Sequence, residues 1–286
     1  MNTLGRIYNI ARYEWRRALA RRMILAVFIL TLIIEVLPIV VLTLLPNVLQ
    51  RFGSLRSYVW LLGALIPQGF FIHFLALLVS AGSMADEYQN ATADVILSKP
   101  LSRVEYLVGK YIGGFSLMSA IAALLVSIGV LASFAAFGNQ LQIVNAPLIL
   151  LGIIASSLIF FSIGFMSGEL LRSTTLSYLA ASSAFIVILI IENVLEAVAP
   201  FQPQSSQGFY YFLGRILPTW AATNLPFMQA DQLFPAILST GLGRVIFQTV
   251  PGTIPEALVY IAIYASAAFV IALLRFSYTD ITKRGS

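Results

Sequence analysis

The sequence contains no cysteine and a single histidine, His73. Without cysteine the chain forms no disulfide, thiol nucleophile, iron–sulfur cluster or cysteine zinc site. One histidine also excludes a multi-histidine metal site within one chain. No G-x-x-x-x-G-K-[ST] stretch is present, so the chain does not bind ATP through a phosphate loop. We therefore expect no metal and no cofactor in this chain.

Charged residues are scarce as well, at 10% of the 286 residues, whereas 59% are hydrophobic and the mean hydropathy is +0.90. Soluble domains contain roughly 45–50% apolar residues. The excess indicates that the bilayer is the solvent for most of the chain. The net charge of +5 reflects where the bases stand along the membrane segments, and we expect no nucleic-acid partner.

Long apolar runs predict an all-α membrane protein with six transmembrane helices. A span needs about 20 mostly apolar residues, and six segments qualify: 23–45, 58–82, 112–137, 147–170, 176–199 and 257–276. The first run is longer than the apolar core of a signal peptide, so we interpret it as an uncleaved anchor. Residues 23–286 then form one membrane domain, and residues 1–22 precede it.

The distribution of lysine and arginine predicts the orientation, because cytoplasmic loops are enriched in these residues. With the N-terminus inside, thirteen of the seventeen bases lie on the inner side: Arg6, Arg12, Arg16, Arg17, Arg21, Arg22, Lys99, Arg103, Lys110, Arg172, Arg275, Lys283 and Arg284. The outer side keeps Arg51, Arg56, Arg215 and Arg244. Both termini are therefore predicted to be cytoplasmic, in a multi-pass protein of the plasma membrane.

Residues 4–19 predict an amphipathic helix along the inner lipid headgroups. Apolar side chains recur at helical spacing, with arginines elsewhere around the helix; they are Leu4, Ile7, Ala11, Trp15, Ala18 and Leu19. A solvated basic segment that serves only to set the topology is the alternative interpretation.

The polar segment 83–111, between the second and third spans, holds seven of the 29 charged residues. Asn90 or Thr92 can cap a short helix that continues through Leu97, and Pro100 ends it because proline disfavours a helical residue before it. Ser102 and Glu105 then form an S-x-x-E capping box that starts the next helix. A short capped helix held between two spans is typical of a docking element.

The outer segment 200–256 is rich in aromatic residues and proline. Asp231 can cap a helix that reaches about Phe247, which is too short to span and too apolar for a plain loop. Backbone at membrane depth is tolerated when it is buried in protein, so we expect partly re-entrant or interfacial helices here.

Several ionisable side chains lie inside the predicted spans. Glu35 lies near the middle of the first span and His73 toward the inner half of the second, so either can line a pathway, bond to a neighbouring helix, or pair with the other. Glu192 and Glu196 can line an exit vestibule, although we favour an ordinary polar helix end. We expect Glu169 and Arg172 only to mark an inner turn; these two lie at the end of the fourth span.

Patterns of membrane enzymes are missing. The four aspartates lie outside the spans, so there is no intramembrane aspartyl pair, and the D-D-x-x-D pattern of prenyl-transfer enzymes is absent; the aspartates are Asp86, Asp94, Asp231 and Asp280. Residues 164–168 place a serine between glycines at the wrong spacing for a nucleophile, and His73 has no orienting acid. We expect no catalysis by this chain alone.

The residues of the polar segment resemble the pattern of type-2 ABC exporter permeases. The likeness rests on Glu87, Asn90-Ala91-Thr92, Ile96 to Arg103 with its L-x-x-P-x-x-R, and Gly109-Lys110. Ala91 stands where the family more often has glycine. Six spans, cytoplasmic termini, an amphipathic first helix and a partly re-entrant last outer loop extend the resemblance over the whole chain.

The resemblance implies a permease docked on two copies of a separately encoded ABC ATP-binding subunit, which would hold ATP and Mg. It also implies a second permease copy, as a homodimer or related heterodimer, with the pathway between the two and with membrane lipid around them. The polar segment would be the coupling helix, in which residues 86–99 contact the ATPase. The implied interface residues are Asp86, Glu87, Asn90, Thr92, Asp94, Leu97, Lys99, Pro100, Arg103 and Lys110.

Two other functions stay open: a secondary transporter, and a non-transporting scaffold that anchors an ATPase. A secondary transporter usually shows midplane charges, broken spans or inverted repeats, and only Glu35 and His73 qualify. The apolar spans favour a lipophilic, lipid-linked or peptide cargo over a highly charged ion.

Overall fold

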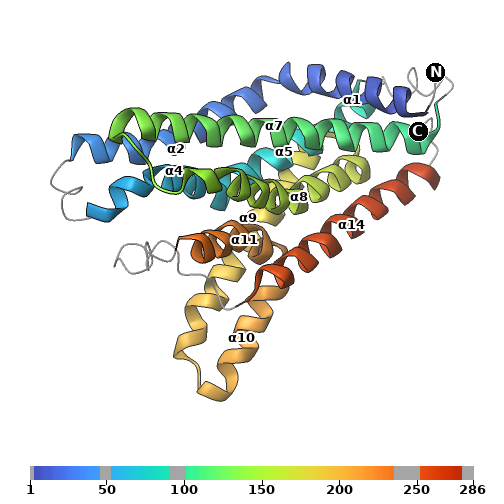
Figure 1. Ribbon diagram of the computed structural model, residues 1–286. Helices are drawn as coiled ribbons and strands as arrows, with labels where there is room; N and C mark the ends of the chain where they lie inside the picture. The colour runs from blue at the N-terminus through green and yellow to red at the C-terminus, as the bar shows by residue number, and fades with distance from the viewer. Residues whose placement is uncertain (1–2, 46–52, 91–100, 235–251, 279–286) are drawn as a thin grey trace.

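The computed structural model describes residues 3–45, 53–90, 101–234 and 252–278, and within these ranges the chain is helical and contains no strand. Figure 1 shows long helices side by side in a bundle, from which one pair of helices, α9 and α10, projects. The helices are α1 (Thr3–Leu19), α2 (Arg22–Leu44), η1 (Gly53–Tyr58), α4 (Val59–Pro67), η2 (Gln68–Ile72), α5 (His73–Gln89), α7 (Arg103–Phe137), η3 (Ile143–Asn145), α8 (Ala146–Leu171), α9 (Thr174–Val198), η4 (Ala199–Phe201), α10 (Gln204–Ile216), α11 (Pro218–Leu233) and α14 (Ile254–Tyr278).

The described residues contain six helical stretches that are long and apolar enough to cross a membrane. They are Arg22–Leu44, Arg56–Gln89, Arg103–Phe137, Ile143–Leu171, Thr174–Phe201 and Ile254–Tyr278. Each contains or nearly contains one predicted span, so the six-span, all-α prediction is confirmed. The second and third stretches extend well beyond their predicted spans into the polar segment, because its flanks continue the helices.

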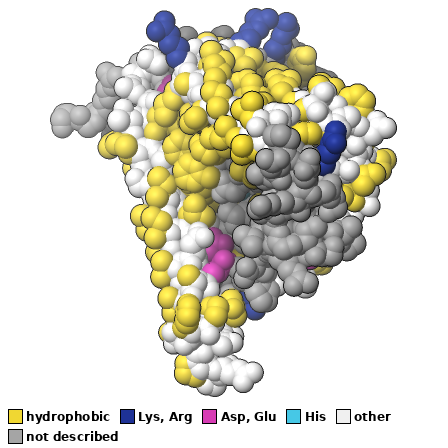
Figure 2. Space-filling view, turned by 90° about the vertical axis from the view of Figure 1, so that its left-hand side faces the viewer, with side chains coloured by type: hydrophobic (Ala, Val, Ile, Leu, Met, Phe, Trp, Pro, Cys, Tyr) yellow, Lys and Arg dark blue, Asp and Glu magenta, His cyan; other side chains and the backbone are white. Residues whose placement is uncertain are grey.

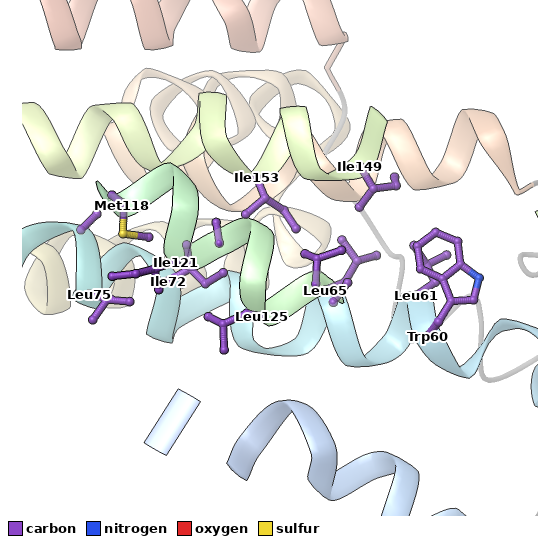
Figure 3. Close-up of a cluster of buried hydrophobic side chains, with 14 of the residues drawn as sticks. Trp60, Leu61, Leu65, Ile72, Leu75, Met118, Ile121, Leu125, Ile149 and Ile153 are labelled. Carbon is purple, nitrogen blue, oxygen red and sulfur yellow. The ribbon is translucent and has the colours of Figure 1, made fainter. Parts of the chain in front are cut away.

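The centre of the bundle is the α4–α5 stretch, which packs against α7 and α8. Figure 3 shows apolar side chains of α4 and α5, such as Leu65 and Leu75, beside Met118 and Leu125 of α7 and Ile153 of α8. By contrast, few of the side chains of α2, α9 and α14 are buried, although these helices are apolar. Hydrophobic side chains accordingly cover much of the face in Figure 2, as expected of surface that contacts lipid tails.

The start of α1, the start of α7 and the end of α14 lie together at one end of the bundle. Arg6 forms an ion pair with Glu105, with 2.7 Å between Nη2 and Oε1. Arg103 donates to the carbonyl oxygens of Phe276 and Ser277 at 3.1 and 3.0 Å. An even number of crossings requires this arrangement; which side of the membrane it faces stays a prediction.

Helix α1 is confirmed as a helix, but one part of its predicted apolar face is wrong. Leu4 and Leu19 are exposed, whereas the buried residues are Ile10, Glu14 and Ala18. The cause is α7, against which α1 packs closely: a Cβ added at Gly113 would lie 2.6 Å from the Cα of Ala11. Contact with lipid headgroups along the other side of α1 stays a prediction.

The outer segment forms α10 and α11, and the predicted cap at Asp231 is wrong. Asp231 lies in the last turn of α11, which begins at Pro218. Proline suits the first turn because its missing N–H has no partner there. Helix α11 is too short to span and is largely buried, with Trp220 and Leu225 fully enclosed between α8, α9 and α14. Its membrane depth stays a prediction, and residues 235–251 lie outside the described ranges.

Candidate functional site

The polar segment is mounted on two helix ends. Helix α5 ends at Gln89 and α7 begins at Arg103. The predicted capping box is present: the Glu105 backbone N–H donates to Ser102 Oγ at 3.1 Å, and the Ser102 N–H donates to Glu105 Oε2 at 3.0 Å. The short helix predicted up to Leu97 lies outside the described residues.

Lys110 lies at the centre of a buried ion cluster that joins α1, α5 and α7. Its Nζ lies 2.7 Å from Glu14 Oε2 and 2.7 Å from Glu87 Oε1. Lys110 and Glu14 are 0% exposed and Glu87 is 1% exposed. A buried charge is tolerated when it is paired and hydrogen-bonded, and removing one partner costs several kcal/mol, about 3–5. The three helices are therefore held together by charge as well as by packing.

Two arginines of α1 complete the cluster. Arg17 Nη1 lies 2.7 Å from Glu87 Oε1, and Arg17 also donates to the carbonyl oxygens of Gly82 and Ser83. Arg21 Nη2 donates to the Gly82 carbonyl at 2.7 Å. Gly82 leaves room for this contact, because a Cβ there would lie 2.8 Å from Arg21 Nη1 and closer still to the Tyr178 hydroxyl group. Bidentate guanidinium groups suit this bridging of carboxylates and carbonyls.

The charges in this cluster determine how Glu14 ionises. Burial opposes the charged form, but the positive charges of Lys110, Arg17 and Arg21 outweigh it and hold the pKa of Glu14 below its ordinary value of 4.5. In the same way, burial of Arg17 is outweighed by Glu14, Glu87 and Asp86, so its pKa is raised. Glu14 and Arg17 are therefore both charged at neutral pH.

Asp86 extends the cluster to α9. Arg21 Nε lies 2.8 Å from Asp86 Oδ2, and Thr174 Oγ1, in the first turn of α9, donates to Asp86 Oδ1 at 2.7 Å. The Thr174 N–H also donates to Gln89 Oε1 at 3.3 Å. Threonine in the first helical turn thus fastens the start of α9 to the end of α5.

Glu169 and Arg172 do more than mark a turn, which corrects the sequence interpretation. Tyr88 donates to Glu169 Oε2 at 2.7 Å, and the Arg172 guanidinium lies 4.6 Å from the centre of the Tyr88 ring. Glu169 is fully buried. These contacts tie the end of α8 to the last turn of α5, so four helices and α1 meet beside the polar segment.

The structure separates the predicted interface residues into two groups. Asp86, Glu87, Arg103 and Lys110 make contacts within the chain. Asn90 is the C-cap of α5, and its N–H donates to the Asp86 carbonyl at 3.0 Å. Glu87 and Lys110 are buried, so they support the segment from inside. The other predicted interface residues lie outside the described ranges: Thr92, Asp94, Leu97, Lys99 and Pro100.

The possible pair of Glu35 and His73 is wrong. His73 Nε2 lies 3.1 Å from Gln68 Nε2, which also donates to Ser156 Oγ at 2.8 Å. Glu35 is buried elsewhere, where α2 meets Gly63 of α4 and Gly129 of α7. Both Glu35 carboxylate oxygens lack a hydrogen-bond partner among the described residues. The two side chains thus occupy separate helix contacts.

Sequence reasoning missed Glu14 and the cluster around it. Glu14 is the only acid before Glu35, and it stands among six arginines. That isolation was a usable signal, because a lone acid in a basic helix needs a reason to be there. Its partner Lys110 is 96 residues away, and no local pattern connects the two.

Comparison with curated protein sequences gives no match. Comparison with protein-family models gives a match over residues 8–281, nearly the whole chain, to the family described as ABC-2 family transporter protein. The matched region contains all six candidate spans and the ion cluster beside the polar segment. The chain therefore belongs to the ABC-2 family of transporter proteins.

Proposed function

We propose that the chain is the transmembrane permease subunit of an ATP-driven ABC exporter that moves its cargo by alternating access. Membership in the ABC-2 family fits a permease subunit that works with an ABC ATP-binding subunit. The proposal that the polar segment couples the permease to the ATPase rests on the buried ion cluster around Lys110. This cluster fastens both helices that flank the segment to each other and to α1.

A rigid mount is what a coupling element requires. A push on a floppy loop is absorbed locally, whereas a push on a segment fixed between α5 and α7 moves packed helices as bodies. Helix α7 continues without interruption from Arg103 to Phe137, across the whole membrane. A displacement at its start is thus transmitted to the opposite end of the bundle.

The proposed assembly contains two ATP-binding subunits, which hold ATP and Mg, and a second permease copy as a homodimer or related heterodimer. It lies in the plasma membrane, surrounded by lipid, with both termini in the cytoplasm. The exposed apolar sides of α2, α9 and α14 supply the surface for lipid and for the second copy. The low charge of the spans favours a lipophilic, lipid-linked or peptide cargo.

Glu35 is our first candidate for the pathway and His73 the second. Glu35 presents a carboxyl group without a hydrogen-bond partner among the described residues, at a point where two glycines give it room. If Glu35 lines the pathway, Glu35→Gln keeps the protein assembled but changes transport. Normal transport by a stable Glu35→Leu variant would exclude this role.

Cross-linking tests the assembly directly. The chain has no cysteine, so Ser98→Cys is a single reporter in the polar segment and Ser205→Cys a matched control at the start of α10. We expect Ser98→Cys to cross-link to a coexpressed ABC ATP-binding subunit, and Ser205→Cys to react with an impermeant maleimide from outside. No copurifying ATPase, together with transport driven by an ion gradient, would favour a secondary transporter; a stable complex without transport would favour a scaffold.

A further inference from the structure

The six arginines that precede the first candidate span differ in their partners. Figure 1 shows α1 alongside the first half of α7 and leading directly into α2. Three of the arginines form ion pairs with acids of α5 and α7; they are Arg6, Arg17 and Arg21. The other three are exposed and join no ion pair among the described residues; they are Arg12, Arg16 and Arg22.

The exposed arginines of α1 lie on one continuous side of the helix. Residues three or four apart are neighbours on a helix surface, and Tyr8, Arg12, Arg16 and Leu19 follow one another at this spacing. Tyr8 is 65% exposed and Leu19 is 59% exposed. Glu14, the only acid of α1, is buried on the opposite side. This side of α1 therefore carries positive charge and apolar area but no negative charge.

We call the exposed side of α1, with the first residue of α2, the basic face. It comprises Tyr8, Arg12, Arg16, Leu19 and Arg22. The first candidate span begins at Arg22. Arg12 comes ten residues earlier, which is about 15 Å along a helix at 1.5 Å per residue.

This distance keeps the basic face within reach of the membrane surface at any tilt of α1. The headgroup layer on each side of a bilayer is about 5–8 Å thick. Attraction to charged headgroups extends about 8 Å further at physiological ionic strength. Even a fully upright α1 therefore leaves all three exposed arginines inside the field of the lipid headgroups.

Positive charge interleaved with apolar side chains is complementary to an anionic lipid surface. A guanidinium group binds phosphate through two parallel N–H donors, and basic amphipathic helices bind membranes that contain anionic lipid. Leu19 and Met23, which is 45% exposed, are next to the start of the span, where the acyl chains begin. An acidic protein surface would match the arginines but not these apolar neighbours, so the observations favour lipid.

We propose that the basic face of α1 binds the headgroups of anionic lipids in the leaflet on the predicted inner side. On the opposite side of the same helix, Glu14 pairs with Lys110 at 2.7 Å. A lipid bound to α1 therefore anchors the ion cluster that holds both flanks of the polar segment. This lipid contact needs no ATP-binding subunit.

Lipid binding is measured on the permease alone, purified in dodecylmaltoside and titrated with dioleoylphosphatidylglycerol. Dioleoylphosphatidylcholine, which has the same chains and no net charge, is the control lipid, and thermal unfolding is the readout. We expect a saturable rise of Tm with phosphatidylglycerol that weakens as salt is added, because salt screens exposed charges. Phosphatidylcholine should produce little of this rise.

Variants assign the effect to the basic face. A basic residue near an anionic surface contributes about fivefold in affinity. Each of Arg12→Gln, Arg16→Gln and Arg22→Gln should therefore raise the half-maximal lipid concentration about fivefold, and the triple variant roughly 100-fold. The triple lysine variant keeps the charges and should lose much less. Arg56→Gln, which removes an exposed arginine of η1, is the matched control and should bind like wild type.

Equal shifts of Tm with the two lipids, or equal responses of the wild type and the triple glutamine variant to phosphatidylglycerol, overturn the proposal. Without added lipid the triple variant should unfold at the wild-type Tm, because its side chains form no ion pair among the described residues. If it unfolds earlier, the three single variants decide. If phosphatidylglycerol has no effect and the triple variant instead fails to bind the ATP-binding subunit, the basic face is a protein contact and the lipid site is excluded.

Discussion

The two ends of α9 show two different solutions for a buried carboxylate. At the end beside the polar segment, the predicted inner end, Asp86, Glu87 and Glu14 are each met by Lys110 or an arginine at 2.7–2.8 Å. At the other end, the predicted outer end, Glu192 lies beside a threonine and an amide of α11, and neither Glu192 nor Glu196 meets a base among the described residues.

Paired and unpaired carboxyl groups have different consequences for the protein. A paired charge inside a protein holds helices together and leaves nothing for a ligand to contact. An unpaired carboxyl group in a largely apolar setting is costly to the fold, and such groups in membrane proteins mark functional sites by default. The cluster around Lys110 is therefore a mount for the polar segment, whereas Glu192 and Glu196 lie at the contacts of α9 with α10 and α11, where no base among the described residues pairs with them.

The largest effect is expected where a paired charge is removed. Lys110→Met leaves Glu14 and Glu87 with fewer positive partners in a buried position, so we expect a loss of about 3–5 kcal/mol in the free energy of unfolding. Unfolding by SDS in mixed micelles measures it. Arg12→Met, an exposed cation of α1, is the control and should change little. If both variants are equally stable, the ion pairs of Lys110 do not stabilise the fold, which contradicts the proposed difference between the two ends of α9.

Glu14→Gln should have an intermediate effect of about 1–3 kcal/mol at neutral pH, because Lys110 keeps Glu87 while one charge-assisted bond is lost. The pKa of Glu14 lies below 4.5 in the folded state, so its contribution is present above that pH and disappears as the pH falls through the folded-state pKa. The difference in stability between wild type and variant should therefore shrink on acidification from pH 7. A constant difference would show that Glu14 is not held charged by its neighbours.

Ser102→Ala should cost about 1 kcal/mol, the usual value of an N-cap, because the Glu105 backbone N–H loses its acceptor. The change tests whether the start of α7 is held locally or only by the ion cluster. Ser102→Asp keeps an acceptor at the cap and should retain most of the stability. Hydrogen exchange of the first turn of α7 is the readout. Unchanged exchange in Ser102→Ala would show that Lys110, and not the cap, holds the start of α7.

The smallest effect is expected at the outer end. Glu192→Gln removes a buried charge that has no cationic partner among the described residues, so the free energy of unfolding should change by less than about 0.5 kcal/mol or rise. The free energy of unfolding should therefore change far less in Glu192→Gln than in Lys110→Met. A loss as large as that at Lys110 would indicate that Glu192 is a structural residue.

The spans and the cap at Ser102 could be predicted because their causes are local. Hydropathy over about 20 residues and the S-x-x-E spacing are both visible within a few turns. The outer segment shows the limit of such reasoning: Asp231 has the chemistry of a cap, but the helix that contains it begins at Pro218, more than three turns earlier. Proline at the first position of a helix was the stronger signal.

The ion cluster could not be predicted, because its members come from three helices. The family resemblance implies that Lys110 contacts the ATP-binding subunit, because Gly109-Lys110 belongs to the pattern that carries the resemblance. Only the packing of α1 along α7 brings Glu14 to it, and that packing depends on the missing side chain of Gly113. The same holds for Glu192, whose neighbours Thr219 and Asn224 follow it by 27 and 32 residues.

ATP-driven transport by proline variants of the polar segment tests the central claim most directly. Ala93→Pro and Val95→Pro fall inside the helix that the sequence predicts up to Leu97, whereas Ser205→Pro falls in the first turn of α10, where proline is tolerated. In proteoliposomes that contain the permease with its ATP-binding subunit, we expect both segment variants to keep ATP hydrolysis and lose transport, and Ser205→Pro to keep both. Undiminished transport by Ala93→Pro and Val95→Pro would contradict the assignment of this segment as the coupling element.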